Sequence, residues 1–243
     1  MMFADGFWLG SLQPFDSIFD VDISFADFSN AAAMWMCLVA LLSFHEFGHA
    51  WAAYKCGDDT ARLMGRMTVN PVVHIDPIGT ILIPWLMILM NSTNTDLGIA
   101  FFGWAKPVPV NPSNLSNRKR DDIFISMAGP IMNVILAIAL VILYRLLLEF
   151  PIDTEKGAVV HEIVNIAFLS MILCMFNLIP IPPLDGSHVM RHVIGMSEMT
   201  YMNIARYGFI ILIVVINLFP EIFNFVFGVS RSVIIFLVQL LGV

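Results

Sequence analysis

The sequence predicts an all-α polytopic membrane protein, a bundle of about 5–6 transmembrane helices. Three observations support this prediction. The 243 residues are 58% hydrophobic and only 13% charged, whereas soluble domains average about 25% charged residues. Several apolar stretches approach or exceed the roughly 20 residues that span a bilayer. Most Lys and Arg residues fall in short segments between these stretches, a pattern that indicates membrane orientation and argues against nucleic-acid partners.

The first half of the chain contains one clear span and one interrupted apolar segment. Residues 1–28 mix aromatic and acidic side chains without Lys or Arg, so we expect a non-spanning lead-in and no cleaved signal peptide. The first span is predicted over residues 30–54. Residues 71–104 are apolar but interrupted by proline, glycine and polar residues. This favours a re-entrant or β-hairpin segment, entering and leaving on one side, over two full spans.

The second half of the chain contains further apolar runs. We expect the second span over residues 123–150, the third over 158–179, the fourth over 207–219 and the fifth over 222–243. Three prolines stop the third span, and Arg231 interrupts the fifth.

The basic residues orient this predicted bundle. One topology places on a single side the residues Lys55, Arg62, Arg66, Lys106, Arg118, Lys119, Arg120, Arg191 and Arg206. By the positive-inside rule that side is cytoplasmic. The acidic N-terminal segment and the turn around Asp153 would then face outward.

The first predicted span carries the sequence His45-Glu46-Phe47-Gly48-His49. On a helix, His45 and His49 point the same way, so their imidazoles can bind one zinc ion, while Glu46 can act as general base. Ionisable residues in lipid are costly, which makes them functional candidates by default. From the helical rise, the two histidines lie on the order of 9–15 Å inside the cytoplasmic edge.

A third ligand is expected from another element, because catalytic zinc usually has three protein ligands and a water. The strongest candidate is Asp185, which follows the prolines that break the end of the third span. The alternative is an ordinary turn, since Pro-Leu-Asp-Gly is good turn chemistry. The span-embedded histidine motif favours the ligand interpretation.

Three other polar residues are candidates for supporting roles. Asn177 could donate a hydrogen bond to an oxyanion, or it could bond the broken end of the third span. Asn133 follows Gly129-Pro130, a kink and close-packing point, and is expected to hold the second span against the site rather than to contact substrate. His74 is either an auxiliary ligand or substrate contact, or part of a structural turn.

Three motifs together resemble the site-2 protease family of intramembrane zinc metalloproteases. They are, in chain order, His45-Glu-Phe-Gly-His49, Gly129-Pro-Ile-Met-Asn133, and the segment from Asn177 through Pro180 to Pro183-Leu-Asp185-Gly186. Residues 70–79 and 103–112 resemble the compact bacterial and archaeal branch without PDZ or CBS domains. The resemblance implies that His45, His49 and Asp185 bind one Zn²⁺ per chain and that Glu46 is the general base.

The resulting prediction is a multi-pass cell-membrane zinc metalloendopeptidase with its active site toward the cytoplasm. We expect one membrane-embedded domain over residues 1–243, with a catalytic core over 30–190 and C-terminal helices over 200–243. Its partners would be the bilayer and a substrate with a transmembrane helix. An edge strand in the 71–104 segment, at Val72 or Val73, could pair with an extended substrate. The sequence leaves open a homo-oligomer or an adaptor.

Two rival functions remain open at this stage. A membrane metal carrier would also place His and Asp along an ion path, but it would not need Glu46. A non-catalytic relative could bind membrane helices without cutting them, and the intact Glu46 argues against that alternative.

Overall fold

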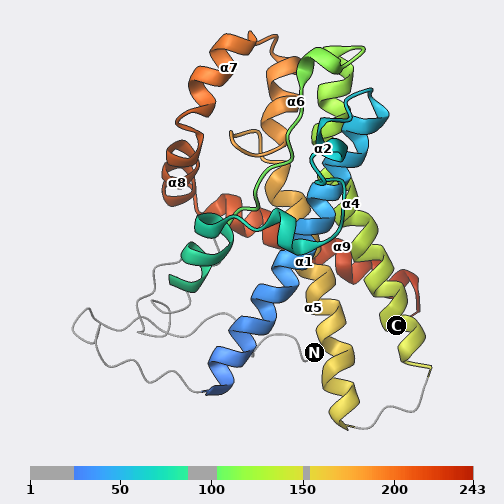
Figure 1. The fold of residues 1–243 in the computed structure, drawn as a ribbon. Helices are drawn as coiled ribbons and strands as arrows, with labels where there is room; N and C mark the ends of the chain where they lie inside the picture. The colour runs from blue at the N-terminus through green and yellow to red at the C-terminus, as the bar shows by residue number, and fades with distance from the viewer. Residues whose placement is uncertain (1–24, 87–102, 150–153, 243) are drawn as a thin grey trace. The chain divides into compact units, whose positions relative to one another are not determined.

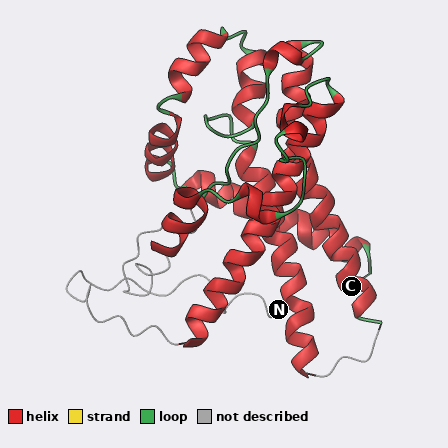
Figure 2. Cartoon of the chain, in the orientation of Figure 1, coloured by secondary structure: helices red, strands yellow, loops and turns green. Residues whose placement is uncertain are grey.

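The computed structural model describes residues 25–86, 103–149 and 154–242. These residues form helices and loops, and none of them is in a strand (Figure 2). The elements in chain order (Figure 1) are α1 (Phe25–Lys55), α2 (Thr60–Leu63), η2 (Pro71–His74), η3 (Pro77–Leu82), η4 (Pro112–Asn114), α4 (Arg118–Leu147), α5 (Thr154–Asn177), α6 (Gly186–Val193), α7 (Glu198–Ala205), α8 (Gly208–Leu218) and α9 (Glu221–Leu240). The described part of the chain confirms the all-α prediction.

The chain divides into two compact units, residues 1–39 with 75–106 and residues 40–74 with 107–243. In the first unit, the indole of Trp35 donates a hydrogen bond to the carbonyl oxygen of Thr80 at 2.7 Å. The Asp76 side chain caps η3 by accepting from the first free amides of that helix. Most of the predicted lead-in lies outside the described residues.

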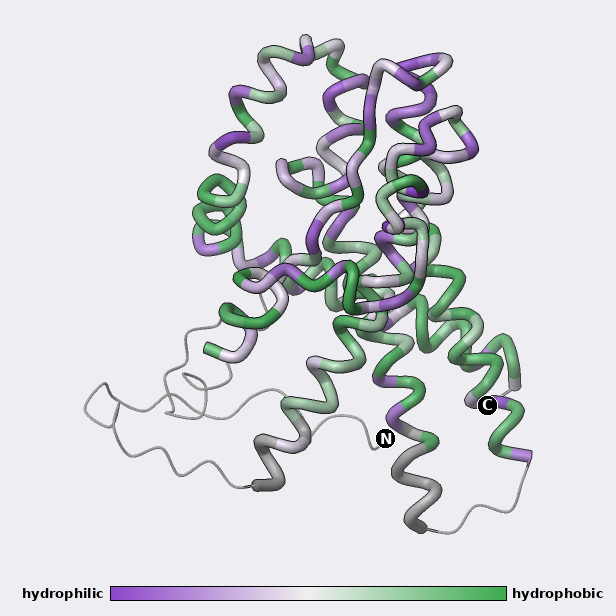
Figure 3. Tube along the Cα trace, viewed as in Figure 1, coloured by the Kyte–Doolittle hydropathy of each residue, from purple (hydrophilic) through white to green (hydrophobic). Residues whose placement is uncertain are grey.

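The core of the second unit forms where α4, α5 and α9 pack against one another (Figure 1). The buried residues that these helices contribute are Ala137, Val141, Ala167, Met171, Cys174 and Ile234. The alanines let the helix backbones approach closely, as is usual for helices in a membrane. Figure 3 shows hydrophobic residues along the C-terminal half of α4 and along α8.

The C-terminal half of α1 packs closely on α4. A Cβ on Gly48 would lie 2.6 Å from the carbonyl oxygen of Ala128, so only glycine permits this approach. One turn further on, Ala52 and Ala53 join a buried cluster with Ile125. Because α1 and α4 are this close, the α1 side chains that face α4 reach its backbone.

Three helices are long and apolar enough to cross a membrane: Ala31–Lys55, Arg118–Leu147 and Glu221–Leu240. A fourth span results if α7 and α8, which are bent by 65° at their junction, count as one broken span. The apolar part of α5, Glu162–Asn177, is shorter than a full span. The chain is therefore a membrane protein, while the count of about 5–6 spans stays a prediction.

Helix α4 begins five residues earlier than the sequence predicted, because its first turn is capped by polar side chains. The Asn117 side chain accepts a hydrogen bond from the Arg120 amide at 3.1 Å. The Asn117 amide in turn donates to Asp121 Oδ2 at 2.7 Å. This reciprocal pairing satisfies amides at the start of α4. The apolar pattern marks only the span and gives no sign of this polar first turn.

The β-hairpin alternative for residues 71–104 is wrong in the described part of that segment. Val72 and Val73 lie in the 3₁₀-helix η2 (Pro71–His74), so they offer no edge strand to a substrate. Both η2 and η3 begin at a proline, whose fixed φ suits the first residue of a helical turn. Residues 87–102 lie outside the described residues, and a re-entrant path for the segment stays a prediction.

Candidate metal centre

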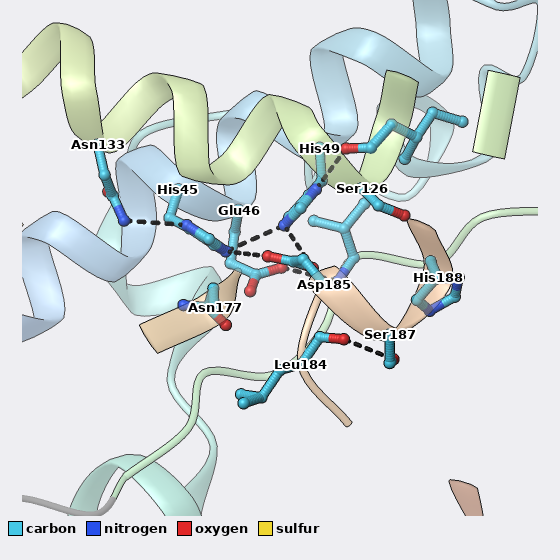
Figure 4. Close-up of polar contacts among 12 residues, drawn as sticks. His45, Glu46, His49, Ser126, Asn133, Asn177, Leu184, Asp185, Ser187 and His188 are labelled. Atoms are coloured by element: carbon cyan, nitrogen blue, oxygen red, sulfur yellow. Dashed lines mark hydrogen bonds and ion pairs between the residues drawn. The ribbon is translucent and has the colours of Figure 1, made fainter. Parts of the chain in front are cut away.

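Two histidines from α1 and one aspartate from the start of α6 converge on one point (Figure 4). The Nε2 atoms of His45 and His49 are 3.0 Å apart. Asp185 Oδ2 lies 3.1 Å from His45 Nε2, and Asp185 Oδ1 lies 3.4 Å from His49 Nε2. Both histidines are buried. The structure thus brings together the three side chains that the sequence singled out as ligands.

This cluster fits a zinc ion. Ligand atoms bound to tetrahedral zinc at 2.0–2.2 Å lie about 3.3–3.6 Å from one another. The separations among His45, His49 and Asp185, 3.0–3.4 Å, are close to this range. Asp185 Oδ2 is buried and accepts no hydrogen bond from the described residues, although His45 Nε2 is nearby. A buried carboxylate oxygen in this state is costly unless a cation binds it. Two imidazoles and a carboxylate also form a donor set that catalytic zinc sites use.

Helix α4 closes one side of the cluster. His49 Nδ1 donates a hydrogen bond to the carbonyl oxygen of Ile125 at 2.7 Å, which leaves the Nε2 lone pair facing the cluster. A Cβ on Gly129 would overlap His49 Nε2. The following Pro130 removes the amide that would otherwise bond the Ser126 carbonyl, which loosens the helix beside the site.

The loop before α6 fixes Asp185. The Ser187 hydroxyl donates to the carbonyl oxygen of Leu184 at 2.6 Å and closes the turn around the aspartate. A Cβ on Gly186 would overlap the carbonyl oxygen of Leu178, so the loop lies tightly against the chain just after α5. The aspartate is therefore held in place by its local backbone.

Glu46 is buried, and in Figure 4 its carboxylate lies beside the cluster. Its Oε2 accepts a hydrogen bond from the backbone amide of Val108 at 3.0 Å. The loop that carries this amide is tethered by Arg66, which donates to the Pro107 carbonyl at 3.2 Å. Sequence reasoning missed Val108, because every residue type except proline carries the same backbone donor.

A comparison with protein families places this geometry in a known context. Two matches to the peptidase family M50 model cover residues 33–156 and 148–219, which include every residue of the cluster. The chain belongs to peptidase family M50. This membership confirms the resemblance to the site-2 protease family and the prediction of a metalloendopeptidase.

Curated bacterial proteins resemble this M50 chain over most of its length. A Bacillus subtilis protein named "Putative zinc metalloprotease YwhC" is 36% identical over 183 residues, which are 73% of this chain and 76% of that protein. Two proteins named Rip2 are each 30% identical. The match to the Mycolicibacterium smegmatis protein covers 72% of this chain and 62% of that protein. The match to the Mycobacterium tuberculosis protein covers 77% of this chain and 67% of that protein. No solved structure matches the chain.

Two other candidate residues of this M50 chain make local contacts. Asn177 Nδ2 donates to the carbonyl oxygen of Leu173 at 2.9 Å, the helix-end contact that was one of its two expected roles. His74 is buried and lies 2.8 Å from the carbonyl oxygen of Thr68 through Nε2. His74 is not part of the metal-binding cluster, and this contact favours the structural interpretation.

A second polar cluster ties α6 to α4. Asp122 lies 3.2 Å from His188 Nδ1 and 2.6 Å from His192 Nε2, and Arg191 approaches the same carboxylate at 3.6 Å. Sequence alone does not pair these histidines with Asp122, because nothing in the spacing of residues so far apart indicates the contact. The cluster anchors the helix that follows Asp185.

Proposed function

We propose that this chain is an intramembrane zinc endopeptidase that cleaves transmembrane segments of membrane proteins. The observation that carries the proposal is the cluster of His45, His49 and Asp185, with a buried Asp185 oxygen, Oδ2, that no described residue satisfies by a hydrogen bond. The two histidines lie in the apolar helix Ala31–Lys55, which is long enough to cross a bilayer. The names of the M50 relatives support zinc as the metal.

The residues around the cluster supply the acid–base chemistry of peptide hydrolysis. Zinc, when bound, lowers the pKa of a coordinated water and polarises the scissile carbonyl. Glu46 would take the proton from the attacking water and deliver it to the leaving amine. The amide of Val108 holds one oxygen of this carboxylate, so Glu46 is oriented before the substrate arrives.

Asn177 is our candidate donor to the oxyanion that forms on the cleaved carbonyl. Its amide nitrogen carries two hydrogens, and the contact with the Leu173 carbonyl uses one of them. The other hydrogen is left for the oxyanion, and the first fixes the side chain that presents it. A neutral amide can donate here without the cost of burying another charge.

The location of the cluster implies the substrate. Peptide bonds in a transmembrane helix are shielded by their own hydrogen bonds, so cleavage requires local unwinding. Helix-breaking residues near the cleaved bond should therefore favour cleavage. The cluster lies toward the Lys55 end of α1, which the positive-inside rule places in the cytoplasm. We propose that water enters from that side, and that the bilayer and a membrane-spanning substrate are the partners.

The test compares the wild-type chain with Glu46→Gln in detergent, measuring zinc content and cleavage of a reporter with one transmembrane helix. Zinc in both proteins with cleavage only by wild type would support the proposal. Zinc in both with cleavage by neither would favour a metal carrier or a non-catalytic relative. Wild-type protein without zinc would refute the proposed site.

A further inference from the structure

We propose that Asn133 of α4 is a positioning residue that sets the tautomer of His45. The inference rests on the proposed zinc site. The amide nitrogen of Asn133, Nδ2, lies 3.1 Å from His45 Nδ1 (Figure 4), on the side of the ring opposite the cluster. Asn133 is fully buried and His45 is 4% exposed, so water does not compete for this contact.

The tautomer matters because only one form of the imidazole can use Nε2 as a metal ligand. A histidine that binds through Nε2 carries its proton on Nδ1 and needs an acceptor there. His49 has that acceptor in the Ile125 carbonyl at 2.7 Å. His45 has Asn133 at the equivalent position, so the two ligands are held by two different kinds of group on the same helix.

The amide of Asn133 can present either its nitrogen or its oxygen to His45 by a half-turn of the side chain. In the structure the nitrogen faces His45, and Asn133 Oδ1 is then buried without a hydrogen-bond partner among the described residues. With the oxygen there, Oδ1 accepts the Nδ1 proton of His45. The metal-binding tautomer requires the second arrangement, because two donors facing each other would repel.

The backbone of Asn133 is itself tied to the next helix. The Ser170 hydroxyl of α5 donates to the Asn133 carbonyl oxygen at 2.8 Å, and Ser170 is fully buried. Asn133 therefore has little freedom to move away from the imidazole.

The rival explanation is that Asn133 only packs α4 against α1. Packing alone predicts that Asn133→Asp, which buries a charge, is at least as harmful as Asn133→Leu. The tautomer role predicts the reverse order, because a carboxylate is a stronger acceptor for the Nδ1 proton and raises the basicity of Nε2. The two explanations therefore separate on the aspartate variant.

The experiment measures zinc affinity of the full chain in detergent by competition with a chromophoric chelator, independently of cleavage. We expect Asn133→Leu to weaken zinc binding by about 10- to 100-fold, as loss of an outer hydrogen-bond partner typically does. Asn133→Asp should bind at least as tightly as wild type. Ser126→Ala is the matched control, because it removes a buried α4 hydroxyl whose hydrogen bond goes to the Asp122 carbonyl and not to a residue of the cluster.

Unchanged affinity in Asn133→Leu would overturn the inference. So would a loss in Asn133→Asp as large as that in Asn133→Leu, or an equal loss in Ser126→Ala. If Asn133→Leu is not folded and monodisperse, Asn133→Asp decides alone, with wild-type or tighter binding in support and a tenfold loss against. Absence of zinc from the wild-type chain would instead refute the proposed function, which keeps the two failures distinct.

Discussion

Gly129 of α4 lies directly against the imidazole of His45, so close that a Cβ there would be 2.6 Å from His45 Nε2. The same Cβ would overlap Nε2 of His49. The glycine is therefore required by the position of the two rings, and no other residue leaves room for them to share an ion. This contact explains why position 129 is a glycine, which sequence alone indicated only as a close-packing point.

We expect Gly129→Ala to displace one or both imidazoles and to weaken zinc binding by at least roughly tenfold. The measurement is zinc affinity, together with circular dichroism to show that the helices persist. The control is Gly228→Ala in α9, where a Cβ would meet no described atom within 4 Å. That change should leave zinc affinity unchanged, and alanine is the better helix former. Wild-type zinc affinity in Gly129→Ala would contradict the close contact.

The hydrogen bond from Val108 to Glu46 can be removed selectively with proline. Val108→Pro deletes the amide that donates to Oε2 at 3.0 Å, whereas Val108→Ala keeps it. A hydrogen bond to a charged group contributes about 1.5–3 kcal/mol, so we expect Val108→Pro to lower the cleavage rate by roughly ten- to a hundredfold while zinc content stays the same. The measurement is cleavage of the reporter substrate alongside zinc content.

Val108→Ala separates the amide from the side chain in this test. Cleavage by Val108→Ala should stay close to wild type. An equal loss of cleavage in both variants would show that the valine side chain matters and the hydrogen bond to Glu46 does not.

Asp58 predicts how stability depends on pH. It is fully buried just after α1 and accepts hydrogen bonds from Thr60, from the Asn111 amide at 2.7 Å and from the Asn114 side chain at 2.8 Å. Burial raises the pKa of this carboxyl, but the hydrogen bonds outweigh burial and hold the pKa below its usual range. The pKa is thus lower in the folded chain than in the unfolded chain, and stability from Asp58 is lost as pH falls below about 4.

We expect Asp58→Asn to lower the thermal midpoint at pH 7 and to flatten its fall below about pH 4. The change removes the charge and leaves the buried donors poorly matched. We expect it to lower the free energy of unfolding by about 1–3 kcal/mol. The measurement is thermal unfolding between about pH 3 and pH 7 for both proteins. An unchanged midpoint at pH 7, or curves that remain parallel at low pH, would show that the carboxylate does not hold the loop in this way.

The convergence of the three ligand side chains could be predicted, because their positions in the sequence indicate which of them face one another. His45 and His49 are one helical turn apart, which places them on one face of any helix. Asp185 was predictable from prolines that must end α5 and turn the chain back. Family membership agrees with the motif order, and the structure adds the distances.

Other features could not be predicted, for three physical reasons. The contacts of Ile125 and Val108 come from backbone groups, which nearly every residue carries, so residue type gives no signal. The helical turns η2 and η3 were missed because proline usually breaks helices, yet it is favourable at their first positions. The pairing of Asp122 with α6 depends on tertiary packing between distant segments, which hydrophobic periodicity does not specify.

The contact between Asp122 and His192 predicts a coupling that a double-mutant cycle can measure. The two side chains meet at 2.6 Å, and the contact fastens α6 to α4 just beyond Asp185. Asp122→Asn and His192→Ala should each lower the stability of the detergent-solubilised chain, and the double variant should lose little more than the worse single variant. Contacting residues show coupling of about 0.5–3 kcal/mol, whereas independent residues add. Because α6 begins immediately after Asp185, both single variants should also weaken zinc binding. Additive losses of stability together with unchanged zinc affinity would show that the contact does not hold the aspartate in place.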